Sequence, residues 1–217
     1  MAAVSLLANL ATFDSNDLAE ESTIQVAMHA STVATITFSF VAGLVLSTSD
    51  YRFGRMDQLL LSSPSTRSIL GGKSVVGFLL GVIYGVLGSV VAVLVTAVYY
   101  QVNDVAIDLT SATVVRPLVG VTIASGLFVV AGIGLGSAIR NQPFALGAGL
   151  VLMLVIQPPL LLGAPDVGRW LPGAAGLAMT LAPDSAMLSQ SGGTVVLIGW
   201  TIVALGAGAW RLNRAGA

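Results

Sequence analysis

Long apolar runs alternate with short polar segments along the whole chain. A transmembrane α-helix needs about 20 consecutive, mainly apolar residues, and five runs come close to that length: residues 24–46, 74–98, 118–139, 144–162 and 194–210. A further apolar stretch, Val4–Leu10, is too short to span and leads into an acidic segment. The pattern predicts an all-α membrane protein with about five transmembrane helices in one domain, residues 1–217, opened by an external segment, residues 1–23.

Three glycines in the second run recur at four-residue spacing: Gly77, Gly81 and Gly85. Residues four apart lie on the same face of a helix, and small residues on one face let another helix backbone approach closely in a membrane. Glycine is also frequent in membrane helices in general. The regular spacing favours a helix-packing face over simple frequency.

Prolines and glycines predict where several helices bend or end. Pro117 suits the first turn of the third helix, where its missing N–H is not needed. Pro158 and Pro159 remove two backbone donors near the end of the fourth helix, which predicts a kink or a stop there. Three further glycines are expected to loosen the end of the third helix: Gly132, Gly134 and Gly136.

Residues 163–191 are too polar and too often broken by proline to span, yet they contain the apolar stretch Leu171–Leu181. One interpretation is a re-entrant-like external segment, with short helices that dip into the membrane and return, shielded by the spans. The other is an ordinary surface loop with an interfacial helix. Trp170 is a candidate membrane-interface anchor in either case.

Composition supports the membrane prediction. Charged residues make up 9% of the chain and hydrophobic residues 55%, whereas soluble domains carry about 25% charged residues. A soluble fold of this composition would expose large apolar patches. The net charge of −1 gives no electrostatic reason to expect a nucleic-acid partner, so the expected surrounding is the lipid bilayer.

The basic residues orient the predicted helices. Cytoplasmic loops of membrane proteins carry an excess of Lys and Arg. With the polar segment 50–73 in the cytoplasm, seven of the nine basic residues lie inside: Arg52, Arg55, Arg67, Lys73, Arg140, Arg211 and Arg214. The chain is therefore expected to be a multi-pass protein of the cell (plasma) membrane with its N-terminus outside and its C-terminus inside.

Segment 50–73 is the long polar interruption between the first two runs. Within it, Arg55–Leu61 can form one or two amphipathic helical turns that end in three leucines. Pro64 breaks this helix because it lacks an N–H and restricts the residue before it. Lys73 stands at the expected membrane edge, where its ammonium can reach phosphate headgroups.

The order of residues in segment 50–73 resembles the ABC-2 type transporter permeases, the membrane subunits of certain ATP-binding-cassette exporters. The matching positions are Asp50, Gly54, Asp57, Leu59, Leu60, Ser62, Ser63, Pro64, Arg67, Ile69, Leu70, Gly72 and Lys73. The tight turn at Arg140 and the broken segment before the last run also resemble the family. This chain departs from the family in two ways. Arg52 stands where the family often has an acidic residue. The family usually has six spans and this chain shows five runs, which implies that the first span is missing or reduced to Val4–Leu10.

The resemblance implies a permease subunit of an exporter, powered by a separate ABC ATPase subunit that itself binds ATP and magnesium. The ATPase would dock on a cytoplasmic amphipathic coupling helix, with the leucines filling a groove and the arginines pairing with acids. Its expected contact residues are Arg52, Arg55, Asp57, Leu59, Leu60, Leu61, Pro64 and Arg67. A second permease subunit, in a homodimer or a heterodimer, would complete the transport path.

Other functions remain open. A membrane scaffold or assembly protein could recruit a soluble partner through segment 50–73 without transport, or the basic residues could only anchor this segment to headgroups. A membrane enzyme acting on lipids is disfavoured because the predicted spans carry no charged residues.

The sequence offers no set of residues for catalysis, cofactor binding or metal binding by this chain. There are no cysteines and only one histidine, His29. Gly72-Lys73-Ser74 ends like a phosphate-binding loop, but Arg67 stands where that loop needs glycine. His29 could relay protons within the membrane, but no acidic residue accompanies it in a predicted span, which favours a packing role.

Overall fold

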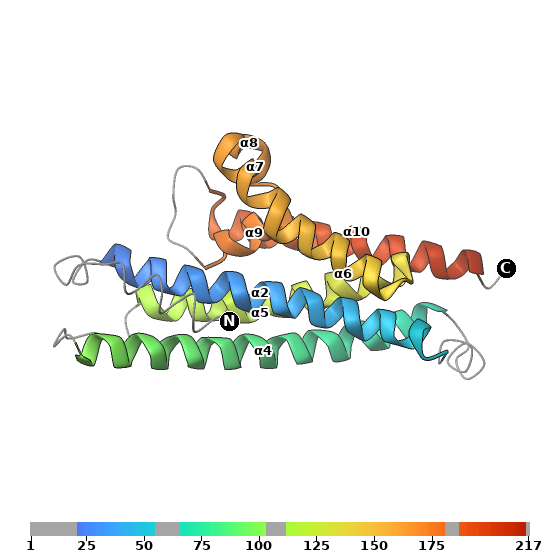
Figure 1. Ribbon diagram of the computed structural model, residues 1–217, viewed down its shortest axis with the longest axis horizontal. Helices are drawn as coiled ribbons and strands as arrows, with labels where there is room; N and C mark the ends of the chain where they lie inside the picture. The colour runs from blue at the N-terminus through green and yellow to red at the C-terminus, as the bar shows by residue number, and fades with distance from the viewer. Residues whose placement is uncertain (1–20, 55–65, 103–111, 181–186, 216–217) are drawn as a thin grey trace.

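The computed structural model describes residues 21–54, 66–102, 112–180 and 187–215 (Figure 1). In chain order the elements are α2 (Glu21–Arg52), α4 (Thr66–Val102), α5 (Ala112–Ile139), α6 (Gln142–Leu150), the π-helix η2 (Val151–Ile156), α7 (Gln157–Gly163), α8 (Pro165–Gly168), α9 (Pro172–Ala178) and α10 (Gln190–Ala215). Every element within these ranges is helical, which confirms the predicted all-α class for the described part of the chain.

Five helical stretches are long and apolar enough to cross a membrane, as the hydropathy pattern predicts, and this is consistent with a multi-pass membrane protein. Helix α2 continues to Arg52 and α4 begins at Thr66, both beyond the predicted runs. With 37 residues, α4 is about 55 Å long, against a hydrocarbon core of about 30 Å. The stretches are Thr32–Arg52, Ser68–Leu94, Val115–Ile139, Gln142–Gly163 and Gln190–Arg214.

Helix α5 is the centre of the bundle and contacts α2, α4 and α10. In Figure 1, α4 runs along one side of the α2–α5 pair and α10 along the other. Apolar side chains of α5 such as Ala124, Phe128 and Ile133 are almost completely buried. Phe128 packs edge-to-face against Phe40 of α2, with ring centroids 6.2 Å apart. A helix that is apolar all round is suited to such a central position.

Glycines let the neighbouring helices approach α5 closely. A Cβ added at Gly134 would lie 2.5 Å from the backbone of Ala204 in α10, and one at Gly136 would lie 3.0 Å from the Ser47 Cβ in α2. Gly132 faces the backbone of α2 in the same way. The helix ends at Ile139, where the predicted run 118–139 ends, and the three glycines, expected to loosen this end, lie at close helix contacts.

Helix α4 meets α5 through its own glycine face. A Cβ at Gly81 would lie 2.6 Å from the Gly126 Cα, and one at Gly85 would lie 2.6 Å from the Thr122 Cα. Gly77 faces the side chains of Val129 and Ile133. The two backbones are thus nearly in contact along this line. Large apolar side chains of α4 that are turned away from α5 are exposed, among them Val75, Leu79, Ile83 and Leu87.

Pro117 lies inside α5 and not in its first turn, so the predicted start of this helix is wrong. The helix begins at Ala112, and Arg116, expected in an external loop, is part of it. Proline at this position removes one hydrogen bond, to the carbonyl four residues earlier. The helix nevertheless continues for 22 more residues, to Ile139, so the missing hydrogen bond does not end it.

The fourth span bends through a π-helix just before its two prolines. Helix α6 passes into η2, and the Gln157 N–H donates to the carbonyl of Leu152, five residues back. The wider π-turn gives the rings of Pro158 and Pro159 room, so α7 continues to Gly163. In Figure 1, α7 and α8 lean away from the rest of the bundle. The sequence predicts a kink or a stop at the prolines; the irregularity is a π-turn ahead of them, and the helix does not stop there.

Helix α9 is short and buried against α10, α2 and α5. Its small residues allow this burial: a Cβ at Gly176 would lie 2.6 Å from the Phe128 ring, and Gly173 faces the Gln157 amide. From α10, Gly193 approaches the Ala175 carbonyl. Residues between α7 and α10 therefore contribute to the interior of the bundle.

Candidate functional site

Five helix ends meet at one end of the bundle, on the right in Figure 1: the end of α2, the start of α4, the end of α5 and start of α6 at their turn, and the end of α10. We call this the basic end. Arg116 belongs to the first turns of α5, at the far end of that helix. The basic end carries Arg52, Lys73, Arg140, Arg211 and Arg214 among the residues whose side chains are described.

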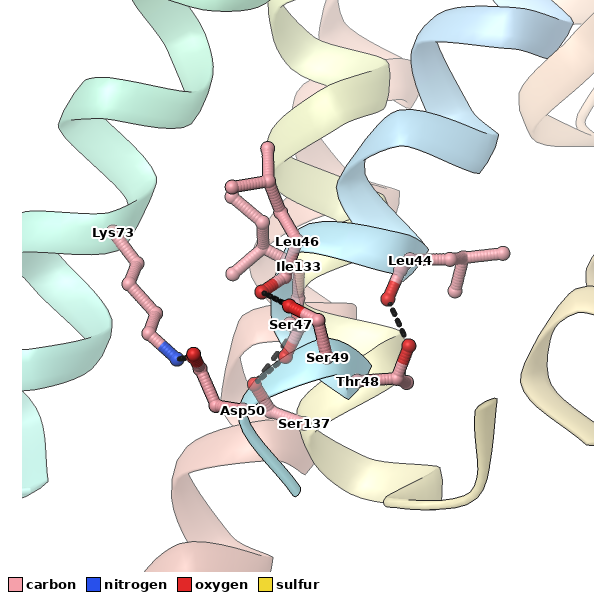
Figure 2. A network of polar contacts seen from close by, with 9 residues as sticks. All are labelled: Leu44, Leu46, Ser47, Thr48, Ser49, Asp50, Lys73, Ile133 and Ser137. Carbon is pink, nitrogen blue, oxygen red and sulfur yellow. Dashed lines mark hydrogen bonds and ion pairs between the residues drawn. The ribbon is translucent and has the colours of Figure 1, made fainter. Parts of the chain in front are cut away.

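An ion pair between Lys73 and Asp50 joins α4 to α2 at the basic end (Figure 2). The side chains of Lys73 and Asp50 are 22% and 15% exposed, so the pair is partly shielded from water. The sequence predicts that Lys73 reaches lipid headgroups, whereas in the structure its ammonium is engaged by Asp50. Local sequence does not indicate this partner, because 23 residues separate Lys73 from Asp50. The ion pair connects both ends of segment 50–73.

Hydroxyl groups fix α2 to α5 beside the ion pair (Figure 2). The hydroxyls of Ser47 and Ser137 are 2.7 Å apart, and Ser137 also donates to the Ile133 carbonyl at 2.8 Å. Thr48 donates to the Leu44 carbonyl at 2.6 Å within α2. All three hydroxyl-bearing residues are buried. The Ser47–Ser137 contact thus ties the last turns of α2 to the end of α5.

Gly54 turns the chain out of α2. Its φ of +64° lies in the left-handed region, which glycine adopts without the penalty of a Cβ. The Phe53 N–H donates to the Ser49 carbonyl at 3.0 Å, as in a helix end. This geometry gives a physical reason for glycine at one position of the ABC-2-like order.

Two of the expected ATPase-contact residues lie within the described ranges. Arg52 is exposed at the end of α2, where its Nη1 donates to the Gln142 Oε1 at 3.3 Å. Arg67 is the second residue of α4. The amphipathic helix Arg55–Leu61 and the break at Pro64 lie outside the described residues, as do the remaining contact residues: Arg55, Asp57, Leu59, Leu60, Leu61 and Pro64.

Arg140 forms the tight turn between α5 and α6 that the sequence predicts. Its φ is +61°, rare for a residue with a Cβ. Its N–H donates to the Gly136 carbonyl at 2.9 Å, and its Nη2 donates to the Arg211 carbonyl at the end of α10, 2.7 Å away. Its guanidinium lies over the Tyr51 ring, 5.5 Å from the centroid. Arg140 thereby connects α2, α5 and α10.

The other candidate residues form no common site in the described part. His29 lies in α2, and its side-chain surroundings are outside the described residues. Asp166 pairs with Arg169 at 3.2 Å, while Asp104, Asp108 and Asp184 lie outside the described ranges. Within these ranges, no three His, Cys, Asp or Glu side chains gather as metal ligands would.

The sites of chemistry in the described part are thus the ion pair, the hydroxyl contacts and the arginines of the basic end. Comparison of the chain with protein-family models and with curated proteins gave no match. The resemblance to the ABC-2 permeases accordingly rests mainly on the order of residues in segment 50–73, together with the turn at Arg140 and the broken segment before the last span, and the function that follows from it is a proposal.

Proposed function

We propose that this chain is the permease subunit of an ATP-driven exporter and that a separate ATPase subunit docks on segment 50–73. The observation that carries the proposal is the ion pair between Asp50 and Lys73. Both residues belong to the ABC-2-like order, and their pairing links the two ends of the segment that would receive the ATPase. Five apolar helices supply the membrane part that such a subunit needs.

In this proposal the basic end faces the cytoplasm, which leaves the N-terminus outside and the C-terminus inside the cell membrane. The clustering of Arg52, Lys73, Arg140, Arg211 and Arg214 at one end of the bundle supports this orientation, because cytoplasmic segments are enriched in Lys and Arg. Segment 163–191 is then external. The burial of α9 against α2, α5 and α10 supports its re-entrant interpretation.

The contacts at the basic end suggest how a push on segment 50–73 would travel. Because the ion pair joins α2 to α4, a force on the segment would act on both helices together. The Ser47–Ser137 contact and the glycine faces join both helices to α5, so the three would tilt as one unit. Of these three helices, α2 makes the main contact with the span of α6, η2 and α7, where Gly149 lies against Phe40 and Leu44. Movement of the three-helix unit past this span, in each of two permease subunits, would open a path for the substrate.

The test is recovery of ATPase activity with the affinity-tagged chain from its native membranes. Leu60→Asp places a charge in the proposed apolar contact, where a buried unpaired carboxylate is costly, and we expect at least about a tenfold loss of co-purified ATP hydrolysis. Val167→Asp is the matched control, because Val167 is an exposed apolar residue of α8 outside segment 50–73. Equal recovery from the Leu60→Asp chain and the unaltered chain would rule out this docking site. A soluble partner recovered without any ATP hydrolysis would favour the scaffold function.

A further inference from the structure

A groove of about 690 Å³ opens at the basic end between the last turn of α2 and the α5–α6 turn. Its polar wall comes from Tyr51 and Arg52 of α2, from Arg140 and from Gln142. Its apolar wall includes Leu146, in the second turn of α6. The fourth span begins at Gln142, so the groove joins a polar rim to the start of a membrane span.

Two arginines give the groove a positive charge that no described carboxylate compensates. The two ion pairs of the described part are Asp50 with Lys73 and Asp166 with Arg169, and neither involves Arg52 or Arg140. A guanidinium carries five N–H donors. Arg52 uses one donor in a 3.3 Å bond to Gln142 and leaves the others for a ligand.

Arg140 contributes a guanidinium that is held in place and only partly hydrogen-bonded. Its Nη2 donates to the Arg211 carbonyl and its plane lies over the Tyr51 ring. Its Nε is buried without a geometric hydrogen-bond partner, and the Tyr51 hydroxyl is buried close enough to Arg140 for the guanidinium to act on it. Glycine would adopt the φ of +61° without strain. Arginine at this turn instead brings a guanidinium that contacts both α10 and α2.

We propose that this groove binds a phosphate group, supplied by an anionic phospholipid of the leaflet at the basic end. Planar guanidinium groups suit phosphate oxygens because they donate in a fork. In the bound state the phosphate lies between Arg52 and Arg140, and an acyl chain passes Leu146 along α6. The apolar wall is what favours a lipid over free phosphate. The proposal does not depend on the ATPase docking described above.

The test measures lipid retained by the purified full chain in detergent, by native mass spectrometry, after addition of dioleoyl phosphatidylglycerol or dioleoyl phosphatidylcholine. We expect the anionic lipid to bind at least tenfold more tightly than the zwitterionic one. Arg52→Gln should reduce this binding about tenfold. Arg116→Gln, an equal loss of charge on an exposed residue at the far end of α5, should leave it unchanged. Equal retention by the Arg52→Gln chain and the unaltered chain would overturn the proposal.

Two further measurements separate the remaining explanations. Gln142→Glu introduces a carboxylate beside Arg52 without removing an arginine, so it should also abolish the rise in melting temperature that phosphatidylglycerol produces in the unaltered chain. A rise that persists in this variant would contradict the groove as the site. Displacement of the lipid by millimolar inorganic phosphate would assign the groove to free phosphate and overturn the lipid assignment. Displacement by an acidic peptide, but not by phosphate, would assign it to a protein partner.

Discussion

Gly81→Ala tests the near-contact of the α4 and α5 backbones most directly. The added Cβ would lie 2.6 Å from both the Gly126 Cα and the Ser125 carbonyl oxygen, roughly 0.8 Å short of the 3.4 Å at which ordinary contact begins. Both neighbours are backbone atoms that cannot turn aside. The two helices must separate locally, and overpacking of this kind costs about 1–3 kcal/mol.

Gly71→Ala in the same helix is the control. A Cβ at Gly71 meets nothing within 4 Å, so this variant changes helix propensity alone, a gain of up to about 1 kcal/mol. The same gain applies to Gly81→Ala and cancels when the two variants are compared. We therefore expect the Gly81→Ala chain to be about 1–3 kcal/mol less stable than the Gly71→Ala chain.

The assay is unfolding in mixed micelles with increasing sodium dodecyl sulfate, followed by tryptophan fluorescence. Trp200 and Trp210 lie in α10, which packs on α5, and the Trp200 indole N–H donates to the Trp170 carbonyl, so all three report on packing around α5. The free energy of unfolding is compared between the two variants. Equal stability of the Gly81→Ala and Gly71→Ala chains would refute the close approach of α4 to α5.

Two other predictions concern paired residues. Replacing either Asp50 or Lys73 by Ala leaves a partly shielded charge without its partner and should lower the free energy of unfolding by about 1–3 kcal/mol; the exchanged pair, Asp50→Lys with Lys73→Asp, should recover at least half of that loss. If the exchanged pair loses as much free energy of unfolding as the two single changes together, the ion pair itself contributes no stability. Gly173→Ala drives a Cβ into the Gln157 amide, the far end of a flexible side chain that can turn aside, and should destabilise the chain by about 1 kcal/mol, the lower end of the overpacking range. In a Gln157→Ala background the same change should have an effect within about 0.5 kcal/mol of zero, and an undiminished cost there would place the clash elsewhere.

Hydropathy alone predicts the number of spans but not their ends. The run 24–46 stops where apolar residues thin out, yet α2 continues to Arg52 because Ser47 and Thr48 satisfy their hydroxyls within the bundle. Helix α4 likewise begins at Thr66, eight residues before the predicted run 74–98. A hydropathy pattern does not reveal polar turns that extend a helix beyond its apolar run.

The contacts that define the basic end depend on residues far apart in the chain. Nothing in local sequence pairs Lys73 with Asp50, or Arg140 with the carbonyl of Arg211, 71 residues away. Glycine spacing does indicate the packing face of α4, since Gly77, Gly81 and Gly85 all face α5. The spacing of Gly132, Gly134 and Gly136 does not by itself indicate packing, because these glycines face two different neighbours in turn, α2 and α10.

The π-helix keeps one side of the fourth span aligned with the bundle. The buried residues of this span follow one another in steps of four: Ala145, Gly149, Met153 and Gln157. In an α-helix each such step overshoots a full turn by about 40°, so the buried line would wind away from its neighbours. Each residue of the wider π-turn η2 rotates less about the helix axis, which reduces this winding. Deleting one residue from 151–156 would leave the hydropathy of the span unchanged, yet it would swing Gln157 away from Gly173 and leave α9 without its polar neighbour.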